Sequence, residues 1–252
     1  MALEDSAGAK RAPEKTDAGP AALSPQDLKA QAAHPGLSED AALALLKRPD
    51  LAGDVLEALA RNGNALRQRK VKLALVQHPR TPRQVSLPLV RQLYIFELMQ
   101  VALTPAVPAD VKRAADDVLL NHLETVTAGE RLTLAHRGSG RLAEELLLDE
   151  DARVAQGALQ NPRLTEVSIV RALRRPEVCS ALVDAICRHP QWSLRREVRI
   201  ALLRHEKTPA AHAVEYARML PPSLVREILQ TSRLPAGVKS LLLKELQERT
   251  GR

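Results

Sequence analysis

The chain has 252 residues, a formal net charge of +7 from 37 basic and 30 acidic side chains, and few aromatic residues: one Trp, two Tyr and one Phe. Because strands are normally rich in aromatic and β-branched side chains, this composition favours helices and argues against a β-sheet protein. The two cysteines, Cys179 and Cys187, are too few for a disulfide framework or a four-ligand zinc site. We expect both to be small, buried side chains.

The sequence also gives no sign of a membrane or secretory segment. Spanning a bilayer takes roughly 18 consecutive apolar residues, and the closest stretch, residues 87–103, contains Arg91 and Glu97. Near the start, Glu4 and Asp5 are not followed by an apolar core segment, which argues against a secretory signal. We therefore expect a cytoplasmic protein with no membrane span.

Residues 1–24 are predicted to be a disordered N-terminal arm. They are rich in Ala, Gly, Pro and charged residues and have almost no large apolar side chain, so burial cannot offset the entropy of ordering them. A helix is then predicted to begin with Ser24 as N-cap, Pro25 at the first helical position and Asp27 in the first turn. Residues 25–250 are expected to form one helical domain.

A five-residue motif punctuates this domain. His78-Pro79-Arg80-Thr81-Pro82 is typical: a His, Asn or Arg comes first, usually before Pro, and Ser, Thr or Pro often comes fifth. Proline ends the preceding helix, and the fifth residue suits the start of the next one. The motifs lie 14 or 16 residues apart, starting at positions 34, 48, 62 and 78, and again at 161, 175, 189 and 205. Each interval holds one short amphipathic helix, and pairs of such helices are expected to form stacked hairpins.

The regular spacing of the motifs is interrupted in the middle of the chain. Two longer helices are predicted within about 82–125: one over 87–103, with Pro88 at its start and apolar residues on nearly all sides, and one over 110–125. The 14-residue spacing returns after His136, and the last helix, 236–248, has the polar residues of a solvent-facing cap. We expect about 14 or 15 short helices in all.

Motifs such as His-Pro-x-Thr-Pro and Asn-Pro-x-Leu-Thr between short helices resemble those of bacterial HEAT-like and leucine-rich-repeat-variant proteins. The resemblance covers roughly residues 25–250. It implies an all-α fold: a right-handed α-solenoid of short helical hairpins, similar to a HEAT or armadillo superhelix, that acts as a scaffold with a concave binding face. The unit here, about 28 residues, is shorter than the HEAT unit of about 40.

Five of the seven histidines occupy the first position of a motif: His34, His78, His136, His189 and His205. Equivalent positions in stacked helices lie about 9–10 Å apart, too far to converge on one metal ion. We interpret these histidines as structural residues whose rings bond the end of the preceding helix. No nucleophile or phosphate-loop motif is found, so we expect a non-enzymatic protein without metal or cofactor.

Basic clusters are the remaining candidates for function. Eight Arg and Lys residues lie between Glu57 and Glu97 with no acidic residue among them, and a second cluster covers 188–207, where Arg195 and Arg199 are expected to share a helix face. The primary hypothesis is a scaffold that binds a protein partner. The alternative is sequence-independent nucleic-acid binding, with a link to DNA repair; a third interpretation is that these are simply solvated helix faces. The candidate contact residues are Arg67, Arg69, Lys70, Lys72, Trp192, Arg195, Arg196 and Arg199.

Overall fold

The computed structural model describes residues 24–250, and all regular secondary structure in this range is helical. The prediction of an all-α protein is confirmed. Of the predicted N-terminal arm, residues 1–23 lie outside the described residues. Ser24 caps the first helix as expected: its Oγ accepts the backbone N–H of Asp27 (3.2 Å), and the Asp27 carboxylate accepts the backbone N–H of Ser24 (3.2 Å).

Within residues 24–250 there are seventeen α-helices and one 3₁₀-helix, more than the 14 or 15 expected. In chain order they are α1 (Pro25–Ala33), α2 (Glu39–Leu46), α3 (Gly53–Arg61), α4 (Gly63–Arg67), α5 (Arg69–Gln77), α6 (Arg83–Val90), α7 (Ile95–Leu103), α8 (Ala109–His122), η1 (Leu123–Thr125), α9 (Ala128–Arg137), α10 (Gly140–Leu146), α11 (Ala152–Leu159), α12 (Glu166–Ala172), α13 (Ser180–Arg188), α14 (Arg196–Arg204), α15 (Ala210–Arg218), α16 (Pro222–Thr231) and α17 (Ala236–Thr250).

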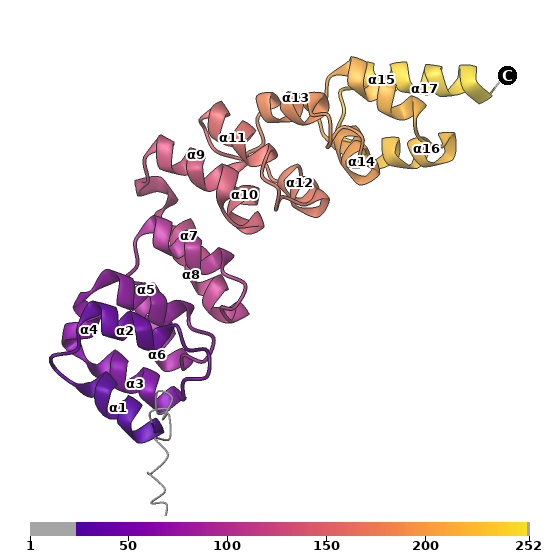
Figure 1. Ribbon diagram of the computed structural model, residues 1–252. Helices are drawn as coiled ribbons and strands as arrows, with labels where there is room; N and C mark the ends of the chain where they lie inside the picture. Colours follow the sequence, from indigo (N-terminus) through magenta and orange to yellow (C-terminus); the bar gives the residue numbers. More distant parts are fainter. Residues whose placement is uncertain (1–23, 251–252) are drawn as a thin grey trace, which may run out of the picture.

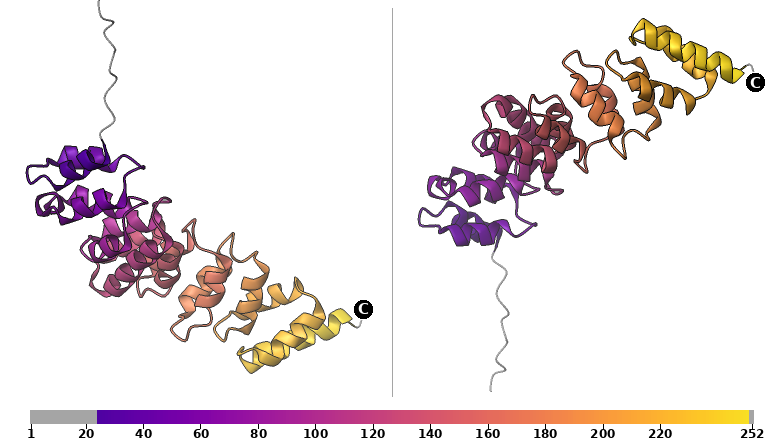
Figure 2. Two further views of the ribbon diagram at one scale, coloured as in Figure 1. Left: turned by 90° about the horizontal axis from the view of Figure 1, so that it is seen from below. Right: turned by 90° about the horizontal axis from the view of Figure 1, so that it is seen from above.

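The helices pack consecutively into an extended, bent stack, with α1 at one end and α17 at the other (Figure 1). In the second half of the stack, each helix packs on the next but one. This gives one row of α8, α10, α12, α14 and α16, and a second row that includes α9, α11 and α13. The first of these rows lies on the inner side of the bend in Figure 1, and the two views of Figure 2 show the same extended arrangement.

A single apolar cluster runs through the stack from Leu28 to Leu246. Helix α14 illustrates how the sequence produces it: Val198, Leu202 and Leu203 are buried, while Arg196 and Arg204 face solvent. A short helix of this kind buries only one apolar stripe, so its stability comes from packing against its neighbours.

The punctuating motifs form turns with a common hydrogen-bonding pattern. In the motif that begins at His78, the Thr81 hydroxyl donates to the Leu75 carbonyl (2.6 Å), and in the one at His205 the Thr208 hydroxyl donates to the Leu202 carbonyl (2.6 Å). Both carbonyls belong to the last turn of the preceding helix, where backbone acceptors have no partner inside the helix. The same motif therefore builds the same turn 127 residues further along the chain.

The role expected for the histidines is wrong in detail. In four of the motifs the ring does not bond the helix immediately before it, although the His78 Nε2 also bonds the Arg48 carbonyl just after α2 (2.9 Å). Instead, Nδ1 accepts the backbone N–H of the residue two positions later: Gly36 for His34 (3.0 Å), and Arg80, Gln191 and Lys207 for His78, His189 and His205 (3.2 Å each). Each ring thus fixes the turn that follows it. The fifth, His136, lies inside α9 rather than at a turn.

Side chains from these turns also reach back to the preceding hairpin. The Asn161 amide donates to the carbonyls of Ala135 (2.7 Å) and Gly138 (3.2 Å), and Asn62 bonds Ala32 (3.0 Å) and His34 (2.9 Å) in the same way. Both asparagines are buried. These bonds join residues 23 to 30 positions apart and satisfy backbone acceptors at buried helix ends.

The helix predicted over 87–103 is wrong: α6 ends at Val90 and a new helix, α7, begins at Ile95. Pro88 lies inside α6 rather than at a helix start, and it cannot donate the backbone hydrogen bond that continues a helix. The Glu97 carboxylate accepts the backbone N–H of Tyr94 (2.8 Å) and so caps the start of α7. The helix predicted over 110–125 is confirmed as α8 followed by η1.

Replacing Thr208 by Val tests the turn chemistry. The substitution keeps the shape of the side chain but removes a buried hydroxyl donor, so we expect the free energy of unfolding to fall by about 1–2 kcal/mol in urea titrations. Thr133→Val is a matched control, because the exposed hydroxyl bond of Thr133 to Gly129 (3.0 Å) lies within one helix; its effect should stay below about 0.5 kcal/mol. Equal losses in the two variants would contradict this role of Thr208.

Candidate functional site

Half of the basic residues between Glu57 and Glu97 form ion pairs in the folded chain. Acidic side chains from outside the block, or at its limits, supply the partners: Arg61–Glu57 (3.4 Å), Arg69–Glu97 (2.6 Å), Lys70–Glu39 (3.4 Å) and Arg83–Asp110 (2.7 Å). Lys72 donates to the Gln92 side chain (3.0 Å) and Arg80 to the Asp50 carbonyl (2.9 Å). Among residues 24–250, the structure gives no such partner to Arg67 and Arg91. The predicted contact residues Arg69, Lys70 and Lys72 are thus engaged within the fold.

Arg69 is held on two sides. Besides its ion pair with Glu97, its guanidinium carbon lies 3.1 Å from the centre of the Tyr94 ring, a cation–π contact. Tyr94 and Phe96, which the sequence places in one long apolar helix, are both exposed. The break between α6 and α7 brings these two aromatic rings to the surface.

Trp192 is not a surface contact residue, contrary to the prediction. Its side chain is only 3% exposed, and the indole N–H donates to the Leu159 carbonyl (2.9 Å). Arg199 is half-buried: its Nε donates to the Ser193 carbonyl (2.7 Å), and its guanidinium carbon lies 5.9 Å from the Tyr216 ring centre. Both residues fix the turn before α14 and leave little surface for a partner.

Arg195 and Arg196 have the opposite character. Arg195 is the N-cap of α14 and Arg196 is its first residue, and both are exposed. Neither side chain has a hydrogen bond or an ion pair within residues 24–250. Because Arg199 turns inward, the exposed face expected for Arg195 and Arg199 together does not form.

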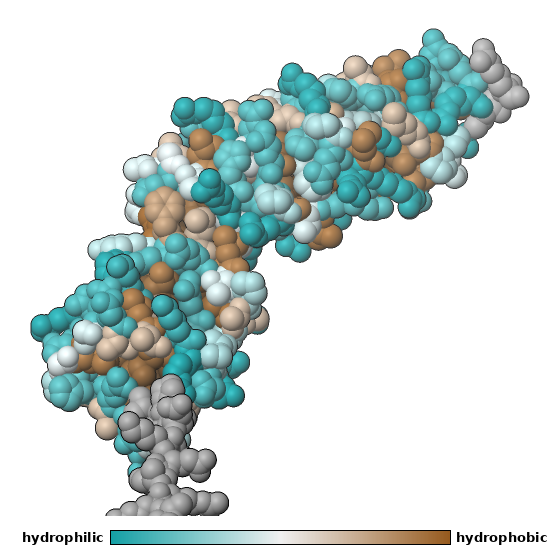
Figure 3. Space-filling view, in the orientation of Figure 1, coloured by the Kyte–Doolittle hydropathy of each residue, from teal (hydrophilic) through white to brown (hydrophobic). Residues whose placement is uncertain are grey.

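Two exposed aliphatic side chains lie near these arginines. The starts of α12 and α14 are adjacent, since the Glu166 carboxylate accepts the backbone N–H of Glu197 (3.0 Å). At these helix starts, Val167 is 62% exposed and Leu194 66% exposed. We call Val167, Leu194, Arg195 and Arg196 the α12–α14 patch. On the face drawn in Figure 3, hydrophobic residues form small patches on a mostly hydrophilic surface.

Sequence reasoning missed the two aliphatic members of the patch. Ile169, Val170 and Leu173 carry the apolar stripe of α12 in the sequence, and Val167 falls outside it. Leu194 precedes α14 and belongs to no helical stripe. For Val167, an apolar residue outside the stripe of its own helix is a signal that could have found it.

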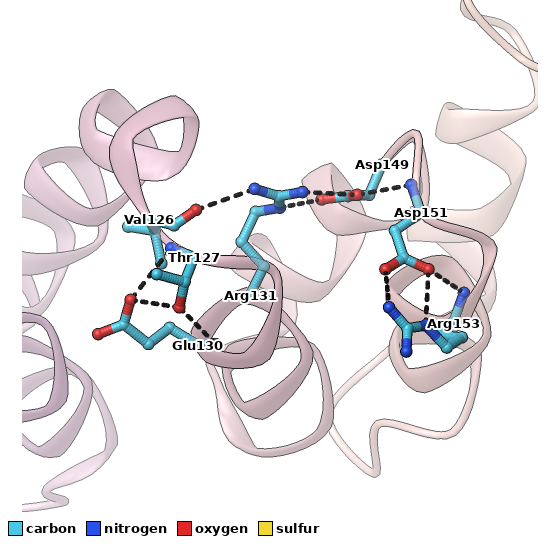
Figure 4. Close-up of polar contacts among 7 residues, drawn as sticks. All are labelled: Val126, Thr127, Glu130, Arg131, Asp149, Asp151 and Arg153. Carbon is cyan, nitrogen blue, oxygen red and sulfur yellow. Dashed lines mark hydrogen bonds and ion pairs between the residues drawn. The ribbon is translucent and has the colours of Figure 1, made fainter.

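A polar cluster joins α9 to the loop before α11 (Figure 4). Arg131 donates to the Asp149 carboxylate (2.7 Å) and to the Val126 carbonyl (2.9 Å), and Asp149 also accepts the backbone N–H of Asp151 (2.9 Å). The Asp149 side chain is only 7% exposed. Next to it, the Arg153 guanidinium and backbone N–H lower the pKa of Asp151 to about 2. These groups satisfy one another, so the cluster serves the fold.

The cysteines differ from each other in environment. Cys187 is buried as expected, and burial raises the pKa of its thiol. Cys179 is exposed, contrary to the prediction; it is the N-cap of α13, and its sulfur accepts the backbone N–H of Leu182 (3.4 Å). In the described part of the chain, no three His, Cys, Asp or Glu side chains are grouped as metal ligands, and no helix has the length and apolar character to cross a membrane.

Arg131→Ala tests the polar cluster of Figure 4. Removing the guanidinium leaves the Asp149 carboxylate nearly buried without its ionic partner, and we expect a loss of roughly 2–3 kcal/mol in the free energy of unfolding, measured by urea titration. Arg153→Ala breaks the exposed ion pair with Asp151 in the same cluster and should leave the unfolding midpoint unchanged. An equal shift in the two variants would show that the burial of Asp149 is irrelevant.

Comparison with known proteins does not assign the chain to a family. No family model matches the sequence, and no curated protein and no solved structure matches it either.

Proposed function

We propose that residues 25–250 are a right-handed α-solenoid of the HEAT-like kind, and that the protein is a non-enzymatic scaffold that binds a protein partner at the α12–α14 patch. One observation carries the proposal: at the adjacent starts of α12 and α14, two exposed aliphatic side chains, Val167 and Leu194, accompany two exposed arginines that have no partner among residues 24–250. Protein interfaces combine apolar contact area with arginine in this way.

The chemistry of the patch also indicates the chemistry of its partner. Helices α12 and α14 belong to the row on the inner side of the bend (Figure 1). A partner that docks there needs an apolar side chain opposite Val167 or Leu194. It also needs carboxylates within reach of Arg195 and Arg196, because an unpaired arginine at an interface favours an acidic partner.

Nucleic-acid binding is the alternative, and the net charge of +7 is the observation that favours it. A phosphate backbone binds best to a continuous row of free cations. Most of the basic block between Glu57 and Glu97 is tied up in ion pairs and hydrogen bonds, and the exposed Tyr94 ring already lies against Arg69. The protein partner is therefore the better-supported proposal.

Site-specific photocrosslinking tests the proposal. With a photoreactive benzoylphenylalanine at position 194, in cells of the organism that encodes the chain, we expect one dominant protein adduct. Position 241 is the matched control, because Leu241 is an exposed leucine on α17. Arg195→Glu with Arg196→Glu should lower the yield of the adduct at least about tenfold, since both charges are reversed. The same adducts from positions 194 and 241, or an adduct unaffected by charge reversal, would refute the proposed interface.

A direct binding measurement distinguishes nucleic-acid binding from the proposed protein interface. With a fluorescent 20-mer of single-stranded or duplex DNA at about 50 mM salt, we expect no saturable change in anisotropy below about 10 µM protein. Submicromolar binding that weakens steeply with added salt would favour the nucleic-acid function instead.

A further inference from the structure

A groove of about 400 Å³ lies where α12, α14 and α16 come together. Its lining includes α12 and the loop after it, α14 from Glu197 to Arg204, the turn after α14 and the end of α16. None of the four residues of the α12–α14 patch lines it, although Glu197 directly follows Arg196.

The groove has an apolar floor and a cationic rim. Leu173, Val178 and Ile200 are buried at the floor. The rim carries several exposed basic side chains, namely Arg174, Arg204, Lys207 and Arg233. Such a combination suits a ligand that has an anionic group on an apolar body.

The arginines of the rim have no partner in the fold. Arg174, Arg204 and Arg233 form neither a side-chain hydrogen bond nor an ion pair within residues 24–250. Glu197 and Glu206 also line the groove, yet neither forms an ion pair there. Lys207 is the one rim cation that is anchored: its ammonium donates to the Val178 carbonyl (2.7 Å).

The register of the stack explains the lack of acidic partners. Elsewhere, arginines meet an acid about one hairpin away, as in Arg69–Glu97 (2.6 Å) and Arg218–Glu245 (2.7 Å). Arg204 lies 29 residues from Arg175 on one side and 29 from Arg233 on the other, so its equivalents in the adjacent layers are also cations. The backbone N–H of Arg233 donates to the Arg204 carbonyl (3.0 Å), which keeps these two layers in contact.

The charge of the lining can be compared with that of a ligand. Glu145 from outside the groove neutralises Arg175 (2.7 Å). The four rim cations then face the two carboxylates of Glu197 and Glu206, an excess of two positive charges. His205 adds none at neutral pH, because burial lowers the pKa of its ring.

We propose that this groove is an anion-binding site for the phosphate group of an organic phosphate monoester. A phosphate monoester carries nearly two negative charges at neutral pH, which matches the charge excess of the rim. The forked, planar guanidinium groups of Arg204 and Arg233 suit bidentate recognition of phosphate oxygens. The organic part of the ligand lies on the floor formed by Leu173, Val178 and Ile200. The site is independent of the protein partner proposed above.

Calorimetric titration of the full chain with phenyl phosphate at low ionic strength tests this site. We expect saturable binding that is tighter than that of inorganic phosphate, which lacks the apolar body, and tighter than that of benzoate, a monoanion. The double substitution Arg204→Met and Arg233→Met should raise the dissociation constant at least about tenfold.

The matched control is Arg67→Met with Arg91→Met, which removes the same net charge from two exposed arginines that lie near the other end of the stack and have no partner among residues 24–250. It should change the dissociation constant less than about twofold. Circular dichroism and the urea midpoint establish that both double variants are folded. The proposal is overturned if phenyl phosphate gives no saturable binding or binds no more tightly than benzoate, or if the two double variants weaken it equally. If position 194 of the otherwise unchanged chain gives no dominant protein adduct while phenyl phosphate still binds saturably, the protein interface alone is refuted.

Discussion

The fold depends on how the ends of its short helices are satisfied. The first four N–H groups and the last four C=O groups of an α-helix have no partner inside the helix. In a helix of eight or nine residues these are most of the backbone polar groups near its ends, and stacking buries many of them. The structure meets this constraint with side chains from the next hairpin. Asn62, Asn161 and Trp192 each donate to carbonyls between 23 and 33 residues earlier, and the Ser232 hydroxyl donates to the Leu203 carbonyl (2.7 Å). The polar residues of the turns therefore join consecutive hairpins. Apolar packing would also hold the hairpins together, but the hydrogen bonds in addition fix the register of one hairpin on the next.

This constraint also decides what could be predicted from the sequence. The turns at His78 and His205 were predictable because proline, threonine and the helix ends interact within a few residues of one another. The break between α6 and α7 was not, since it depends on Glu97 capping Tyr94 and pairing with Arg69, which lies 28 residues away. Trp192 was misjudged for a related reason: an aromatic residue beside a basic cluster suggests a binding surface, but its indole N–H is needed by a carbonyl of the preceding hairpin.

The candidate sites also depend on contacts between helices that are distant in the sequence. In the sequence, the block between Glu57 and Glu97 is the densest basic segment, and it was a candidate together with the cluster over 188–207. Its acidic partners, such as Glu39 and Asp110, belong to neighbouring helices, and only the packed stack brings them within ion-pairing distance. The exposed positions of Val167 and Leu194 also follow from packing, because solvent exposure depends on which helices cover a residue. Counting charged or apolar residues along the sequence could predict neither the ion pairs of the basic block nor the α12–α14 patch.

Some arginines of the C-terminal half are informative because they have no partner among residues 24–250. Where the stack needs an arginine, it supplies an acceptor: Asp149 for Arg131, Glu145 for Arg175 and the Ser193 carbonyl for Arg199. Arg204 and Arg233 have none among residues 24–250, although they lie in adjacent layers around one groove and their like charges oppose close packing. The position of Arg204 recurs in each layer of the stack, and either a cation or an acid can occupy it. One layer earlier, for example, Arg175 pairs with Glu145. Like charges in two successive layers repel each other, and either an acidic residue or an anion bound from outside the chain would relieve that repulsion.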